Sequence, residues 1–113
     1  MDANKWPNDA DGDVLRRLLA KGFDFSKAQL IDFNVDFEDW PPAQEAIQAL
    51  QAEFHGVEAC EDSENGGGYV LFKMNSILSY DLVIETQAKA THLVAKYGGR
   101  CESWGVLSKP KKP

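Results

Sequence analysis

An unbroken alternation of apolar and polar residues marks the segment 31–37. The odd positions are apolar, namely Ile31, Phe33, Val35 and Phe37. The even positions are polar, namely Asp32, Asn34 and Asp36. A period of two predicts a β-strand with one buried face, and a shift of one residue would bury carboxylates. We therefore expect a central strand whose apolar face carries two helices and whose other face is acidic.

Three amphipathic segments predict helices, because apolar residues recur every three or four positions between capping or helix-breaking residues. Their expected limits are Asp9 or Asp11 to Gly22, Pro41 to Gly56, and Ser79 to Gly98. The side chains expected to face the core are Val14, Leu15, Leu18, Leu19, Ala43, Ile47, Leu50, Phe54, Val83, Ile84, Ala90, Leu93, Val94 and Tyr97.

Three further segments predict strands, at 57–61, 69–76 and 100–107. The first two of these flank a stretch rich in glycine and polar residues, in which Asn65-Gly66 is the strongest turn signal. We expect a hairpin there. The glycines that follow Asn65 are assigned to the same hairpin.

The resulting order is one helix followed by β-α-β-β-α-β, which is typical of a ferredoxin-like α/β sandwich with an extra N-terminal helix. Right-handed crossovers place both crossover helices on one face of a four-stranded antiparallel sheet with the strand order 4-1-3-2. The segments 31–37 and 69–76 are then the central pair. The other face of the sheet brings together Asp32, Asn34, Asp36 and Tyr69.

The composition predicts one domain, 1–108, followed by a basic tail, 109–113. The net charge is −6, but the tail holds three of the twelve basic residues and no acid, so the body carries nine basic and eighteen acidic residues. An acidic body attracts basic partners and repels phosphate backbones, so we expect no direct contact with nucleic acid. The chain lacks a long apolar run and a signal-peptide pattern, which predicts a cytoplasmic protein without a membrane contact.

Motifs for catalysis or metal binding fail on their spacing. The aspartates of the segment 9–13 resemble a calcium loop, but Val14 would stand where the turn glycine belongs and Ala20 where the bidentate glutamate belongs. The glycines 66–68 precede a strand, whereas a phosphate-binding loop leads into a helix. The histidines and cysteines fall on separate elements, so we expect no metal site, disulfide, cofactor or catalytic residue.

Three stretches carry a family resemblance: Trp6-Pro7-Asn8-Asp9-Ala10-Asp11-Gly12-Asp13-Val14-Leu15-Arg16-Arg17-Leu18, then Phe23-Asp24-Phe25, then Tyr97-Gly98-Gly99-Arg100-Cys101-Glu102-Ser103-Trp104-Gly105. In this order, over about residues 6–107, they resemble the RraB family of ribonuclease E inhibitors. The resemblance implies a ferredoxin-like fold and a cytoplasmic bacterial regulator that binds an arginine-rich scaffold region of ribonuclease E, outside its catalytic centre. Better-known members end in a long acidic tail, whereas this chain ends in Lys109-Pro110-Lys111-Lys112-Pro113.

Two other classes of function remain open. A small-molecule-sensing domain of the ACT type shares the β-α-β-β-α-β order and pairs edge to edge around its ligand, so ligand-dependent dimerisation would identify it. An enzyme would require a cleft with convergent polar groups. We favour a protein-binding regulator of ribonuclease E, with no enzymatic activity of its own. We expect its contact to be made by the acidic face, at Asp32, Asn34, Asp36 and Tyr69, and not by the basic tail.

Overall fold

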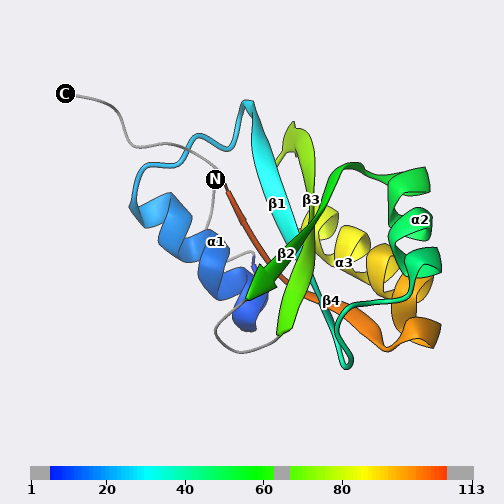
Figure 1. Cartoon of the computed structure of the whole chain (residues 1–113). Coiled ribbons are helices and arrows are strands. Elements are labelled where there is room, and N and C mark those ends of the chain that lie inside the picture. The colour runs from blue at the N-terminus through cyan, green and yellow to red at the C-terminus, as the bar shows by residue number, and fades with distance from the viewer. Residues whose placement is uncertain (1–5, 63–66, 107–113) are drawn as a thin grey trace.

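The computed structural model describes residues 6–62 and 67–106 of the chain. It is a mixed α+β fold with three α-helices, one short 3-10 helix and a four-stranded antiparallel sheet (Figure 1). The elements, in chain order, are α1 (Ala10–Ala20), β1 (Ala28–Phe37), α2 (Gln44–Glu53), β2 (His55–Asp62), β3 (Gly67–Ile77), α3 (Tyr80–Val94), η2 (Ala95–Tyr97) and β4 (Gly99–Val106).

The sheet has the strand order β2-β3-β1-β4, which confirms the expected order and the central position of β1. Ile31 of β1 lies opposite Met74 of β3, and Phe33 lies opposite Phe72. On its other side β1 pairs with β4, with an irregularity between Asn34 and Val35. Pairing on both sides gives β1 a fixed register, because a slip would have to break both ladders at once.

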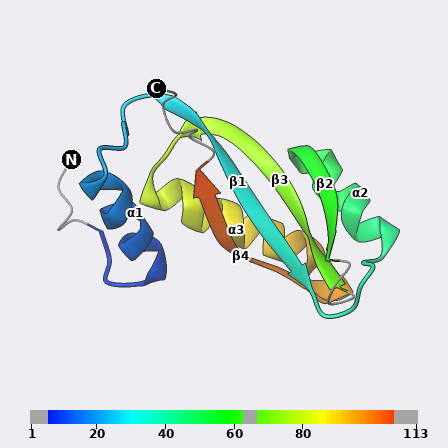
Figure 2. The same cartoon turned by 60° about the vertical axis from the view of Figure 1, so that its left-hand side comes forward.

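The core lies between the sheet and a layer of helices on one of its faces. Phe72 of β3 stacks on Phe33 of β1 and on Phe54 at the end of α2, with ring centroids 5.2 and 4.0 Å apart. Ile31, Phe33 and Val35 are fully buried, as the alternation predicted. Figure 2 looks onto the opposite face of the sheet, with α3 behind the strands, α2 at the β2 edge and α1 beside the β4 edge.

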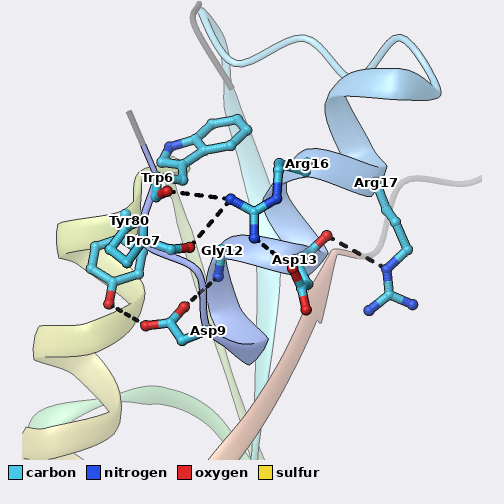
Figure 3. A network of polar contacts seen from close by, with 8 residues as sticks. All are labelled: Trp6, Pro7, Asp9, Gly12, Asp13, Arg16, Arg17 and Tyr80. Carbon is cyan, nitrogen blue, oxygen red and sulfur yellow. Dashed lines mark hydrogen bonds and ion pairs between the residues drawn. The ribbon is translucent and has the colours of Figure 1, made fainter. Parts of the chain in front are cut away.

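Helix α1 begins with a compact polar network (Figure 3). Asp9 is its N-cap, and the Asp9 carboxylate accepts hydrogen bonds from the Gly12 amide at 2.8 Å and from the Tyr80 hydroxyl of α3 at 2.7 Å. These two bonds, the Tyr80 bond first, lower the pKa of Asp9, and the same carboxylate raises the pKa of Tyr80 to about 12. A side chain at Gly12 would collide with the Pro7 carbonyl oxygen, so this close approach requires glycine.

A second aspartate, Asp11, ties α1 to the rest of the domain. Its Oδ1 accepts a hydrogen bond from the Trp104 indole of β4 at 2.7 Å and a longer one from the buried Gln87 of α3 at 3.4 Å. The carboxylates of 9–13 therefore cap and anchor a helix, which agrees with the rejection of a calcium loop.

Several local expectations were wrong. Gly56 does not end α2, because β2 begins at His55 and Gly56 lies in an irregularity of the β2–β3 ladder with φ +65°. Gly68 belongs to β3 and not to a turn, and its missing side chain leaves room for the Trp40 ring. Ile84 of α3 is exposed, because the inward-facing side of that helix is occupied by Thr86 and Gln87. The expected turn at Asn65-Gly66 lies outside the described residues.

Replacement of the anchoring carboxylate should destabilise the domain. We expect Asp11→Ala to lower the free energy of unfolding by about 1–3 kcal/mol, because it leaves the partly buried Trp104 indole without its acceptor. The matched variant Asp13→Ala removes an exposed first-turn carboxylate that pairs with Arg16, and should cost no more than about 1 kcal/mol. Urea unfolding measures both, and equal losses would contradict the anchoring role.

Candidate protein-binding face

The side of the sheet that faces away from α2 and α3 is called here the open face. Within residues 6–62 and 67–106 no helix lies across it (Figure 2). The register places all four expected contact residues on it, since Asp32, Asn34 and Asp36 of β1 lie opposite Lys73, Leu71 and Tyr69 of β3. The structure therefore brings these residues together on one rigid surface.

Asp32 and Lys73 face each other across the two strands but lean apart. The Asp32 carboxylate oxygen lies 3.3 Å from the place where a side chain on Gly105 of β4 would begin, so it leans toward β4. The Lys73 stem lies 3.5–3.6 Å from the corresponding place on Gly56 of β2, so it leans toward β2. No ion pair joins the two side chains within the described part of the chain. Asp32 thus remains accessible beside a glycine.

The β4 side of the open face is polar. Asn34 donates a hydrogen bond to the Ser103 hydroxyl at 3.3 Å, which fixes the orientation of the amide. Arg100 lies opposite Asp36 in the register, but its guanidinium pairs with Glu102 at 3.2 Å. Because that pair is already formed, the carboxylates of Asp32 and Asp36 give this side of the sheet an unneutralised negative strip.

Tyr69 of β3 stands on the opposite side of β1 from the Arg100–Glu102 ion pair, and its side chain is 38% exposed. Its pKa is raised, first by a hydrogen bond with Cys60 of β2 and further by burial and the nearby carboxylates of Asp32 and Glu58. The hydrogen bond with Cys60 thus holds the phenol at the edge of the acidic strip.

The open face also carries apolar side chains near the first residues of β1. Leu30 is 40% exposed and Ile77 of β3 is 53% exposed. Leu30 lies opposite Asn75, and Ile77 lies opposite Ala28, so the two apolar side chains are diagonal neighbours. An apolar patch beside a charged strip is typical of a surface that binds another protein.

Possible metal ligands do not come together in the residues that the structure describes. These residues contain no group of three or more histidine, cysteine or acidic side chains placed to hold a metal ion. Cys60 and Cys101 are free and lie on β2 and β4, with two strands between them, which is too far for a disulfide. Burial raises the pKa of the Cys101 thiol to about 12. Across the same residues, no helix is long and apolar enough to span a membrane.

Comparison with known proteins assigns the chain to a class of regulators. Residues 8–106 match the model of the RraB family, described as regulator of ribonuclease activity B, and the chain belongs to that family. Membership implies a protein that regulates ribonuclease activity. A search of individual curated proteins gives no significant match.

Sequence reasoning missed other residues of the open face. Glu58 and Cys60 contribute charge or hydrogen bonding there, and Ser103 and Gly105 position or expose the carboxylates of β1. The alternation in β3 indicated that Leu71 and Lys73 lie on this face. The irregularities in the β1–β4 and β2–β3 ladders have no sequence signal, so the faces on which Ser103 and Glu58 lie could not be predicted.

The influence of Cys60 on Tyr69 can be measured directly. We expect Cys60→Ala to lower the pKa of Tyr69 toward its ordinary value of 10.0, and Asp32→Asn to lower it by less, because the thiol is the larger cause. Titration of the tyrosine ring carbons by NMR follows each residue separately. A Tyr69 titration that is the same in both variants as in the parent protein would contradict this arrangement.

Proposed function

We propose that this protein binds ribonuclease E through the open face and thereby inhibits the turnover of RNA without acting on RNA itself. The observation that carries the proposal is a sheet face that no helix in residues 6–62 and 67–106 covers, and on which β1 presents two aspartates in a fixed register. Membership in a family of ribonuclease regulators supports a ribonuclease as the partner.

The physical argument for this surface is rigidity. Asp32 and Asp36 lie on the same side of a central strand, four residues and about 13 Å apart. A strand that is paired on both sides holds charges at a fixed spacing, so little conformational entropy is lost when a partner binds. Asn34 and Tyr69 add hydrogen-bonding groups beside the carboxylates.

The chemistry of the partner follows from the charge of the strip. Exposed carboxylates steer a basic partner and recognise guanidinium groups by paired hydrogen bonds. An arginine-rich scaffold segment of ribonuclease E fits this requirement. The strand order and the crossover helices on one face support a ferredoxin-like arrangement, which leaves the opposite face of the sheet available for this contact.

Removal of the two charges should weaken the contact while the fold is kept. We expect Asp32→Asn with Asp36→Asn to slow association with purified ribonuclease E roughly fivefold and to make binding less sensitive to salt. Surface plasmon resonance at several salt concentrations measures both effects, and an RNA cleavage assay measures the loss of inhibition.

The matched control is Glu45→Gln with Glu85→Gln, which changes the net charge equally at exposed positions of α2 and α3. This control should bind as the parent protein does. If both double variants lose binding equally, only net charge matters and the open face is not the contact. Deletion of residues 109–113 should leave binding unchanged, and loss of binding on that deletion would also overturn the proposal.

A further inference from the structure

β3 is longer than the strand that covers its outer side. β2 begins at His55, which lies opposite Lys73, whereas β3 continues to Ile77 (Figure 2). On this side the sheet order ends with β2, so residues 74–77 have β1 as their only strand neighbour in the described part of the chain. In an antiparallel strand, alternate residues direct their backbone N–H and C=O groups toward one neighbouring strand, and the residues between them direct these groups to the other side. This stretch therefore offers main-chain groups to an added strand.

A groove lies directly beside this free edge. Its volume is about 460 Å³. Its lining comes from the end of α2, the start of β2, β3 and β1: Leu30, Glu53, Phe54, His55, Gly56, Lys73, Met74 and Asn75. Leu30, Phe54 and Met74 make its lining apolar, and Gly56 has no side chain to close it. The groove has room for a bulky apolar side chain next to the free edge.

The charge at the rim of the groove is positive. Glu53 is already paired with Lys89 at 2.8 Å. Lys73 leans over Gly56 toward the groove, away from Asp32, and forms no ion pair with any described residue. Because Glu53 is neutralised and Lys73 is not, the rim favours a carboxylate on whatever binds there.

We propose that the free edge of β3 and this groove form a second docking site, which takes an extended peptide segment by strand addition. The segment places one bulky apolar side chain against Phe54 and Met74, on the helix side of the sheet, and one acidic side chain on Lys73, on the other side. Strand addition uses main-chain hydrogen bonds for affinity and side-chain pockets for specificity. This site adjoins the acidic strip at Lys73, which lies opposite Asp32, but it uses the free edge of β3 and not the carboxylates of β1, so it does not depend on the proposed contact with ribonuclease E.

A peptide fits this site better than a second copy of the chain. The free edge spans four residues, or about 13 Å, and the turn from α2 into β2 stands at one end of it. A second folded copy would have to place its own edge strand beside residues 74–77, where the α2–β2 turn would obstruct the rest of the domain. An extended segment has no such bulk.

NMR titration of the complete, ¹⁵N-labelled protein tests the proposal. The probe is a capped six-residue peptide that alternates leucine with threonine and carries one aspartate. The control peptide has serine in place of leucine and lysine in place of aspartate. We expect the probe to give saturable shifts in the amides of 74–77 and 53–56, and the control peptide to give none. Lys73→Glu should weaken binding of the probe about fivefold, whereas Lys21→Glu, at the exposed end of α1, should not.

Shifts confined to the open-face strip around Asp32 and Asp36, or no shifts at all, would overturn the proposal. The protein without peptide could also sediment as a dimer and show concentration-dependent shifts in the amides of 74–77. That result would assign the edge to a second copy and would overturn the proposal as well. Neither result bears on ribonuclease E binding, because the Asp32 and Asp36 variants test that contact separately.

Discussion

The two-sided pairing of β1 is the constraint on which the rest of the structure depends. Ile31, Phe33 and Val35 are fully buried on one face, and each contributes about 1.5–3 kcal/mol of hydrophobic stabilisation. A one-residue slip would expose them and bury Asp32, at an additional cost on the order of several kcal/mol. The same register that forms the core therefore holds the aspartates outward. Core formation and the presentation of the acidic strip are one physical event.

The motif-rich N-terminal segment has a structural role in this arrangement. Asp9 caps α1 and binds Tyr80, and Asp11 joins the helix to Trp104 of β4, so residues far apart in the chain meet at one network. The helix is held beside the β4 edge, on the side of the core, and no helix of the described residues covers the open face (Figure 2). The N-terminal stretch that carries the family resemblance thus holds α1 at the β4 edge and away from the open face.

The strand order and the location of the core followed from the sequence, because a period of two and a helix period of 3.6 report which side is buried. Details that depend on contacts between distant segments did not follow. Gln87 is buried where Asp11 and the Val83 carbonyl accept its hydrogen bonds, and Gly68 stands in β3 where a larger residue would collide with the Trp40 ring. The irregularities in strand pairing at His55 and Asn34 likewise determine which side chains lie on the open face. No local sequence pattern marks these irregularities.

The central claim is that the partner lies against the open face. A photoreactive phenylalanine analogue placed at position 69 replaces an exposed ring on that face, and the same analogue at position 84 replaces the exposed Ile84 of α3 in the helix layer. Irradiation in the presence of purified ribonuclease E should give a covalent adduct from position 69 and none from position 84. An adduct from position 84 alone would place the partner on the helices and contradict the account.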